Sequence, residues 1–599
     1  MDRHRRNRRQ THHRCRLLRS HPPGLMKRDS TAQPSHMTPR PTASSTPHPL
    51  ALQHLPVVSP RAVCVGVLIA LAGWGANAQT PSIIDPAGIM MQDHLKRIEQ
   101  AAPPATVAPS APLAPPEPTA PATKGRVGVV EIQFSPSELL STQELRQLGE
   151  KYVGRSLGSA DIQALLEEIS TLYRNRGILT AVPVLPQQDL RSGVMRILLV
   201  EGRLGQVKVR QPWVANPLWV QDWFDLLPNV VVTADALQSK LQRFNQVSDF
   251  SATAEFTAGD RFGFSDLEID IAATERVQPW AFYETSSAGK STTPDQWAAG
   301  LRVSPATSMG GRVDAAVLHT DTGDTLTGSV SLPLTYKGWR TGLTGSAAES
   351  KTVLPSQEVG KQDLTILGTS QSLNWDLGRT WILQDPWILG TAISLGRQES
   401  RTQLDDGLDL FRHTVKRVSL VGTLQHESIR NRFLLRATLT GAREHAGNND
   451  RQVSYRFWEL NGNWTSVIDS DGKWYLRTSG VFRGQPSGSL GSIDRFQLGG
   501  TDTVRGFNAG ASSGDQGAAL QLEVRYRLPE WQSINAETYA FIDGGYTKAD
   551  GVQKDLNSAG LGIQTKLNTH LGIDLMLTHQ LTEPLGSRNR ATLRAVVSW

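Results

Sequence analysis

The segment Phe496-Gln-Leu-Gly-Gly-Thr-Asp-Thr-Val-Arg-Gly-Phe507, read together with Phe541-Ile-Asp-Gly-Gly545, decides the fold of this chain. The first segment is a glycine-punctuated loop in which Arg505 stands two residues before an aromatic side chain. The second is predicted to be a strand whose alternate positions put Phe541 and Asp543 on one face. A guanidinium is a planar, permanently charged fork that an aspartate can accept bidentately. The two segments therefore predict a loop arginine held by an aspartate on a wall.

These residues carry a family resemblance. Thr503-Val-Arg-Gly-Phe507 resembles the loop motif of the outer-membrane assembly-factor superfamily, and Phe541-Ile-Asp-Gly544 resembles its strand motif. The resemblance implies a loop folded back into a 16-stranded barrel, with its arginine against an aspartate of the inner wall. The implied latch residues are Val504, Arg505, Gly506, Phe507, Phe541, Asp543 and Gly545. Because the barrel interior holds water, such a pair would be worth modestly more than a surface ion pair and could be released.

The N-terminal segment 1–78 is predicted to be a signal peptide. An apolar run at 62–72 follows Arg61 and is short for a transmembrane helix. Ala76-Asn-Ala78 then matches a signal-peptidase site. The segment is long for a signal peptide, so it is either extended or mis-started, with translation beginning at Met26 or Met37. An internal membrane anchor is the alternative.

Charge and cysteine placement exclude two classes of protein. Residues 1–78 hold about 12 Lys and Arg against about 2 Asp and Glu, whereas the whole chain has a net charge of +6, so the remainder carries about −4. No basic patch therefore argues for a nucleic-acid partner. Both cysteines, Cys15 and Cys64, lie in the same segment, which leaves the rest without a disulfide framework or a thiolate metal site.

Residues 79–100 are predicted to form a plug helix, and residues 101–125 a Pro/Ala-rich linker. Asp85-Pro86 supplies an N-cap and a proline at the first helical position, and Met91, Leu95 and Ile98 follow at helical spacing. In two-partner secretion transporters a similar helix sits inside the barrel. The linker composition predicts an extended tether of up to ~70 Å. A plain flexible extension is the alternative.

Two α/β modules are expected at 126–203 and 204–277. The first has the order β-α-α-β-β, and its segments Tyr173-Arg-Asn-Arg-Gly177 and Glu201-Gly202 resemble the POTRA domain of two-partner transporters. The second resembles a POTRA domain more loosely, and its first helix cannot be placed between 212 and 233. Open sheet edges in such modules could add an incoming chain as a further strand. Substrate binding is therefore expected within 126–277.

Residues 278–599 show the alternation of a transmembrane β-barrel. In Leu520-Gln-Leu-Glu-Val-Arg-Tyr-Arg-Leu528 every second residue is apolar and the others are polar or charged. Apolar-out, polar-in strands suit a closed sheet in lipid, and the length fits about 16 antiparallel strands. A soluble β-sandwich is the alternative. The chain ends at Trp599, and a closing strand with a terminal aromatic resembles the signal read by the barrel assembly machinery.

Motifs for catalysis are not supported by their context. Gly510-Ala-Ser-Ser-Gly514 matches G-x-S-x-G but lies in a loop without the strand–turn–helix setting of a nucleophile elbow. Ala288-Gly-Lys-Ser-Thr292 ends like a phosphate loop, but position 284 is Glu rather than Gly. We therefore predict no enzyme activity, no catalytic residue, no metal site and no cofactor.

The sequence thus predicts α+β POTRA modules followed by an all-β transmembrane barrel with an N-terminal plug helix, in a chain that resembles the two-partner secretion family of outer-membrane transporters. Its expected function is to recognise an unfolded partner exoprotein in the periplasm and translocate it to the cell surface without nucleotide hydrolysis. Expected partners are this exoprotein (an adhesin, haemolysin or contact-dependent toxin), outer-membrane lipid and the barrel assembly machinery, with the chain a monomer. An outer-membrane barrel assembly factor is the first alternative, and a passive porin or surface adhesin the second.

Overall fold

The structure is a computed structural model of the 599-residue chain. It describes residues 85–102, 126–272, 275–288, 291–354, 364–384, 386–405, 407–447, 451–487, 489–530, 534–568, 570–582 and 587–599. The predicted signal peptide (1–78) and nearly all of the predicted linker (101–125) lie outside the described residues.

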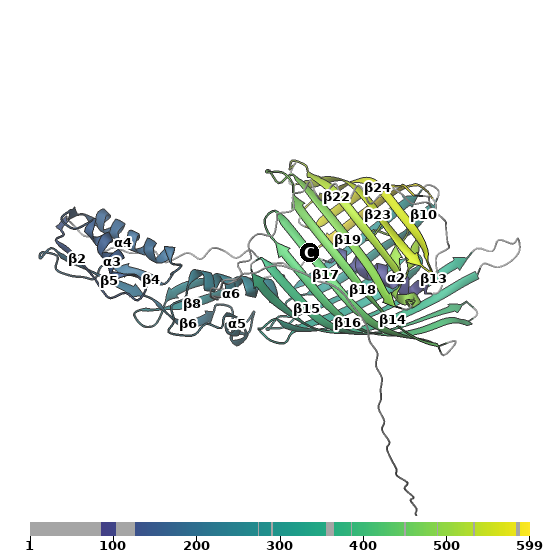
Figure 1. Cartoon of the computed structure of the whole chain (residues 1–599), viewed down its shortest axis with the longest axis horizontal. Coiled ribbons are helices and arrows are strands. Elements are labelled where there is room, and N and C mark those ends of the chain that lie inside the picture. The colour runs from purple at the N-terminus through teal and green to yellow at the C-terminus, as the bar shows by residue number, and fades with distance from the viewer. Residues whose placement is uncertain are drawn as a thin grey trace, which may run out of the picture. The chain divides into compact units, whose positions relative to one another are not determined.

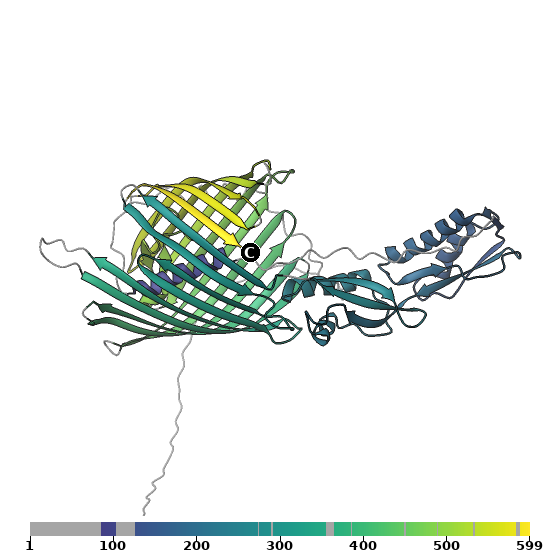
Figure 2. The same cartoon turned by 180° about the vertical axis from the view of Figure 1, so that it is seen from behind.

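A closed antiparallel barrel forms the C-terminal part of the chain (Figures 1 and 2). In the described residues it has sixteen strands, so the predicted fold class is confirmed. The last strand closes on the first, with Ala591 opposite Ser287 and Ser598 opposite Trp280. The strands are β9 (Val277–Ala288), β10 (Ser291–Val303), β11 (Arg312–Thr320), β12 (Gly323–Pro333), β13 (Trp339–Leu354), β14 (Leu364–Gln384), β15 (Trp387–Leu404), β16 (Asp409–Glu427), β17 (Asn431–Ala446), β18 (Arg451–Val467), β19 (Trp474–Ser487), β22 (Gln516–Arg527), β23 (Asn535–Ala549), β24 (Val552–Lys566), β25 (Leu571–Gln580) and β26 (Asn589–Ser598).

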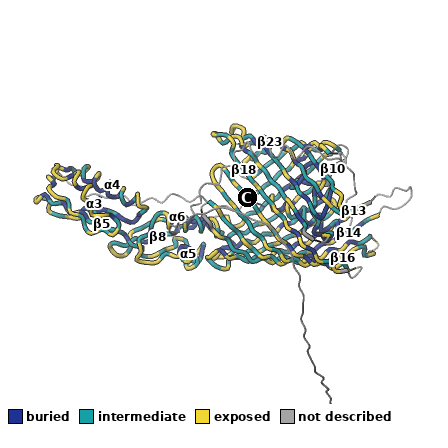
Figure 3. The backbone as a smooth tube through the Cα atoms, viewed as in Figure 1, coloured by how far each residue is buried: buried dark blue, intermediate teal, exposed yellow. Residues whose placement is uncertain are grey.

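Exposed residues alternate with less exposed ones along many of the barrel strands, as the colours of Figure 3 show. On β22, Leu520 and Val524 are exposed to the outside, whereas Glu523 and Arg525 are buried in the lumen. The outward apolar row gives lipid a hydrophobic surface, while closure of the sheet satisfies the backbone within the bilayer. In the described part of the chain no helix is both long and apolar enough to cross a membrane.

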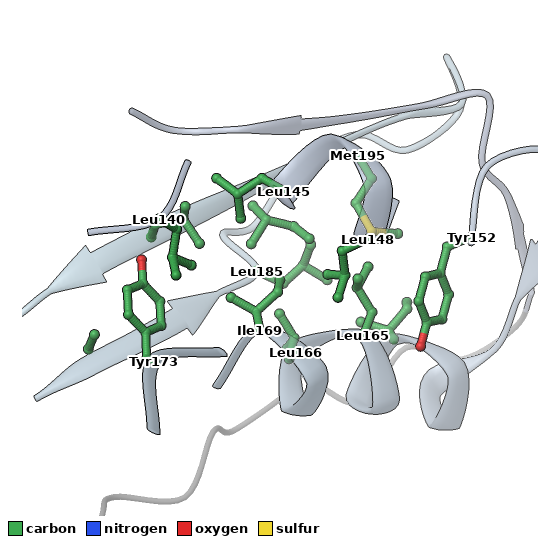
Figure 4. Close-up of a cluster of buried hydrophobic side chains, with 14 of the residues drawn as sticks. Leu140, Leu145, Leu148, Tyr152, Leu165, Leu166, Ile169, Tyr173, Leu185 and Met195 are labelled. Atoms are coloured by element: carbon green, nitrogen blue, oxygen red, sulfur yellow. The ribbon is translucent and has the colours of Figure 1, made fainter. Parts of the chain in front are cut away.

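The first α/β module has a three-stranded sheet covered by two helices. Its elements are β1 (Val127–Gly128), β2 (Glu131–Phe134), α3 (Thr142–Glu150), β3 (Ser156–Leu157), α4 (Ser159–Asn175), β4 (Ala181–Val184) and β5 (Val194–Glu201). The sheet order is β2-β5-β4, with β2 and β5 parallel. The apolar face of α4, including Leu165, Leu166 and Ile169, packs with Leu148 and Met195 in one core (Figure 4).

The second module repeats this connectivity. Its elements are β6 (Arg203–Val209), α5 (Pro217–Phe224), α6 (Ala234–Val247), β7 (Ala252–Ala258) and β8 (Phe264–Ile271), in the sheet order β6-β8-β7 with β6 and β8 parallel. Helix α5 is the helix that the sequence pattern left unplaced. Asn216 caps it, with its side-chain oxygen accepting from the backbone N–H of Leu218 at 3.0 Å, and Pro217 is its first residue.

Helix α2 (Pro86–Ala101) lies inside the barrel, against β9 and β11–β15 (Figures 1 and 2). The predicted cap is present, since Oδ1 of Asp85 accepts from the backbone N–H of Gly88 at 3.0 Å. The start of the helix fits closely, because a Cβ on Gly368 of β14 would lie 3.0 Å from the Cβ of Ala87. The fold class therefore includes the predicted helix within the barrel.

Candidate functional site: a loop and a helix in the barrel lumen

The connection from β19 to β22 folds into the lumen. We call its described part, residues 489–515, the lumen loop. It begins with a short 3-10 helix, η1 (Ser492–Asp494), and continues as a hairpin of β20 (Phe496–Leu498) and β21 (Ser512–Gly514). Gly499 and Gly500 have positive φ angles of 105° and 93°, which favour glycine at the hairpin turn. The Thr503 hydroxyl closes the turn by accepting from the backbone N–H of Gly499 at 2.9 Å.

Arg505 lies at the tip of the lumen loop and grips Asp543 of β23. Its Nη2 donates to Oδ1 at 2.7 Å and its Nε donates to Oδ2 at 2.8 Å, which is the bidentate geometry of a guanidinium and a carboxylate. The backbone N–H of Arg505 also donates to Oδ2 at 3.0 Å. Asp543 is only 1% exposed and Arg505 7%. The aspartate is thus satisfied almost entirely by one loop residue.

Two further wall side chains complete the surroundings of the arginine. Nη1 of Arg505 donates to Oε1 of Glu523 on β22 at 2.5 Å, and the guanidinium carbon lies 3.7 Å from the centroid of the Phe541 ring. Arg525 donates to the other oxygen of Glu523 at 2.7 Å. Arg505 of the loop and Arg525 of the wall therefore alternate with the wall carboxylates of Asp543 and Glu523. We call Arg505, Asp543 and Glu523 the tip latch.

The other predicted latch residues, Val504, Gly506 and Phe507, pack the tip of the loop closely against the wall. Val504 and Phe507 are buried in an apolar cluster with Phe496 and Leu498 of β20. Gly506 has φ +90°, and a Cβ there would lie 2.6 Å from Cγ2 of Thr578.

Gly545 is close-packed in the same way, since a Cβ there would lie 2.6 Å from the Ala518 carbonyl oxygen and from Cδ1 of Leu498. Trp599 lies apart from the loop: it is 54% exposed, and its backbone N–H donates to the Pro279 carbonyl at 3.1 Å.

Sequence reasoning placed Glu523 on the lumen side but did not include it in the latch. The pairing of β22 with β23 explains why Glu523 reaches Arg505. Glu523 lies opposite Phe541, which is two residues from Asp543 on β23. Two other wall contacts to the loop were also missed. Gln580 donates to the Gly506 carbonyl at 2.7 Å, and Arg590 donates to the Asn508 side chain at 2.7 Å.

Helix α2 reaches both the wall and the lumen loop through polar side chains. His94 is hydrogen-bonded through Nδ1 to the Thr325 hydroxyl of β12 at 2.8 Å. The Gln92 amide donates to the Ile493 carbonyl of the lumen loop at 2.9 Å, and Gln100 donates to Asp502 near its tip. The predicted apolar stripe therefore gives only part of the buried face, since His94 and Arg97 are buried as well.

The motif residues of the first module hold its fold. The Tyr173 hydroxyl donates to Glu201 at 3.0 Å, and burial raises the pKa of Tyr173. Glu201 also accepts from the backbone N–H groups of Glu138 and Leu139. A Cβ on Gly202 would lie 2.4 Å from the Thr180 carbonyl oxygen. These residues make contacts within the module and fix one end of its sheet. They do not identify a substrate contact, so substrate binding within 126–277 remains a prediction.

Known proteins match both parts of the chain. The model of the haemolysin secretion/activation protein family ShlB/FhaC/HecB matches residues 301–567, and the ShlB-type POTRA domain model matches residues 127–202. The heme/hemopexin transporter protein HuxB of Haemophilus influenzae is 24% identical over 439 residues, which cover 70% of this chain and 75% of that protein. The outer membrane transporter CdiB of Escherichia coli is 25% identical over 446 residues, which cover 70% and 73%.

A solved structure agrees with the fold. The structure of CdiB from Acinetobacter baumannii aligns with a TM-score of 0.58 and 18% identity over 85% of this chain and 98% of that one. The POTRA match, the family model and the relatives together favour export of a partner protein over assembly of other barrels. The chain therefore carries a ShlB-type POTRA domain and a ShlB/FhaC/HecB family domain, and its homologues are two-partner secretion transporters of the outer membrane.

Proposed function

We propose that this chain exports one unfolded exoprotein and that the conformation described above is its closed state. The exoprotein enters from the periplasm, contacts the POTRA modules, crosses the lumen after the lumen loop and helix α2 have moved, and folds outside. Folding outside the cell supplies the direction of transport. The proposal needs no nucleotide, cofactor, metal or catalytic residue in this chain.

The observation that carries the proposal is the way in which the lumen is filled. Both the lumen loop and α2 are attached to the wall by buried ion pairs as well as by apolar contacts, with Arg505 against Asp543 and Arg97 against Glu284. Water in an opened lumen could hydrate each of these groups, so release costs much less than exposure of an apolar core. Ion pairs of this kind would let the lumen loop and helix α2 leave the wall and return to it repeatedly.

The POTRA modules offer outer strands for the incoming chain. Strand β7 is an outer strand of the second sheet, and its residues Thr253 and Glu255 are exposed. An extended segment of the exoprotein could pair along such an edge by backbone hydrogen bonds. Arg210 beside Glu255, Glu268 and Asp270 gives the same face a charged character, which favours polar segments of cargo.

We propose three further features of the assembly, which the barrel fold supports. Lipid contacts the outward apolar rows, the terminal strand ending at Trp599 is recognised by the barrel assembly machinery during biogenesis, and one chain forms one complete barrel. We assign no nucleic-acid partner. The relative named as a heme/hemopexin transporter suggests one class of cargo, and adhesins, haemolysins and contact-dependent toxins are the others.

The test is co-expression of the chain with the N-terminal part of a large exoprotein encoded beside its gene. We expect the fragment in the medium only when the chain is present, and less of it with Arg505→Ala. If the fragment stays in the periplasm while other outer-membrane barrels fail to assemble on depletion of the chain, the proposal is wrong and the chain is an assembly factor.

A further inference from the structure

The lumen loop contacts the barrel wall along its length, and its start and its tip lie on different strands. Its tip lies against β22, β23 and β25 through Arg505 and Gly506. Its start, at η1, lies instead against β16, β17 and β18, where Ile493 and Leu490 pack with Val415. In the strand order β16 and β23 are five places apart. The loop therefore extends from β16 to β25 along the wall. The tip latch holds the loop at Arg505 but not at its start.

A second set of buried polar contacts holds the start of the loop. Nε of Arg417 on β16 donates to both carboxylate oxygens of Asp494, at 2.8 and 3.0 Å, and the Tyr455 hydroxyl of β18 donates to Oδ2 at 2.8 Å. Asp494 is 5% exposed. Nη1 of Arg483 donates to the Asp494 backbone carbonyl at 2.6 Å. We call Asp494, Arg417 and Tyr455 the root anchor.

The residues beside Asp494 pack closely against the wall at the root anchor. A Cβ on Gly491 would lie 1.4 Å from Oε2 of Glu444 and 2.8 Å from the Tyr455 hydroxyl, so a larger residue there would displace these two wall side chains. The neighbouring Ile493 carbonyl is also the group that accepts from Gln92 of helix α2. The root anchor therefore fixes the part of the loop that the helix contacts.

We propose that Arg417 and Tyr455 are positioning residues of a second hold on the lumen loop, which opens independently of the tip latch. The tip moves away from β23 while the root anchor keeps η1 on β16 and β18, and the lumen clears fully only when the root anchor also opens. The role of this step in export depends on the proposed function, whereas the independence of the two holds does not.

Two buried cysteine probes test the independence. Cys15 and Cys64 are first replaced by serine, so that an introduced cysteine is the sole thiol. Ser492→Cys reports on the root, since the Ser492 hydroxyl oxygen is buried, and Val504→Cys reports on the tip, since Val504 is 0% exposed. The alkylation rate of each is measured in the full chain in proteoliposomes. The matched control is Arg436→Met, which removes an exposed lumen-facing arginine from the adjacent strand β17.

We expect Arg417→Met to raise the labelling rate of the root probe roughly 10- to 100-fold, the effect of losing a buried charged hydrogen bond, and to leave the tip probe unchanged. Arg505→Met should do the reverse, Arg417→Lys should restore part of the root protection, and Arg436→Met should change neither rate. Equal acceleration of both probes by Arg417→Met, or of neither, would overturn the proposal. Labelling needs no exoprotein, so this result is separate from any failure of the export assay. Heat-modifiable migration of each variant shows that the barrel has folded.

Discussion

Arg97 of helix α2 donates from Nη1 to Oε1 of Glu284 at 2.6 Å, and both side chains are more than nine-tenths buried. Glu284 belongs to β9, the strand that closes the barrel against β26. Nε of Arg97 also donates to Asp93 of its own helix at 2.7 Å. The helix is therefore tied by one arginine to the seam of the barrel. Removing Arg97 would take this ion-pair partner away from the buried Glu284 carboxylate, whereas removing Glu284 would leave Arg97 paired with Asp93.

Arg97→Met should loosen the helix while leaving the barrel folded. A cysteine at Ala101, which is 5% exposed, reports on helix departure through its alkylation rate in a C15S/C64S background. We expect the rate to rise roughly tenfold or more, because the lost ion pair is buried and hydrogen-bonded. The control is Lys96→Met, which removes an exposed cation from the same helix. Equal rates for Arg97→Met and the parent would show that the seam contact does not hold the helix.

Asp543→Ala should free the loop tip and lower export. It removes three hydrogen bonds from Arg505 and leaves that guanidinium with Glu523 alone. We expect roughly a tenfold or greater fall in exported exoprotein per folded barrel, since leaving a buried hydrogen-bonding group unsatisfied costs about 1–3 kcal/mol. Secretion at the parental level by a variant with normal barrel amounts contradicts the latch role.

Arg505→Lys should export less than the parent but more than Arg505→Ala. An ammonium keeps the charge but cannot donate to both oxygens of Asp543 and to Glu523 in the geometry of the guanidinium fork. The same secretion assay applies, with Arg436→Lys as the matched change on β17. If the lysine variant equals the parent, charge alone is sufficient and the fork geometry is unnecessary.

Gly506→Ala should displace the loop tip. Its φ of +90° strains any L side chain, and the new Cβ would meet Thr578 at 2.6 Å. Gly551→Ala is the control for backbone strain alone, because Gly551 has φ +81° and no atom within 4 Å of the added Cβ. We expect only Gly506→Ala to speed alkylation of a cysteine at Val504. Similar effects of both variants would assign the result to backbone strain and not to the fit of the tip.

Acid should weaken the start of helix α3 in the first POTRA module. A hydrogen bond from the Ser141 hydroxyl and a second from Arg176 lower the pKa of Glu144 to about 2. The carboxylate is thus favoured in the folded module, so its stabilising effect is complete above the unfolded pKa of about 4.3 and is lost as the pH falls toward 2. Hydrogen exchange of α3 amides, corrected for intrinsic rates, should show this loss. Glu144→Gln should abolish that pH dependence, whereas Glu150→Gln, at the exposed end of the helix, should retain it.

Local sequence patterns predicted the parts of the structure that depend on near neighbours. Alternation placed Leu520 outside and Glu523 inside, because a strand turns successive side chains to opposite faces. Asp85-Pro86 predicted the start of α2. The same signal, Asn216-Pro217, begins helix α5, but the aromatic residues around it obscured the helical period, and that helix was left unplaced.

Contacts set by strand register were beyond the sequence pattern. Asp494 and Arg417 are 77 residues apart, and nothing in their local sequences states that η1 lies against β16. Arg97 lies outside the predicted apolar stripe, and its partner, Glu284, lies 187 residues away in a strand, so helical spacing could not predict the contact. The latch pair was predicted because a family resemblance supplied the long-range contact that alternation and helical spacing do not contain.

The measurement that tests the closed lumen most directly is a single-channel recording of the purified chain in planar bilayers. We expect the parent to be closed most of the time with brief openings, and deletion of residues 85–102 combined with Arg505→Met to give long, stable openings. Arg436→Met should behave like the parent. A steady open pore in the parent, with the same conductance after the deletion, would contradict a lumen closed by the loop and the helix and would favour a passive porin.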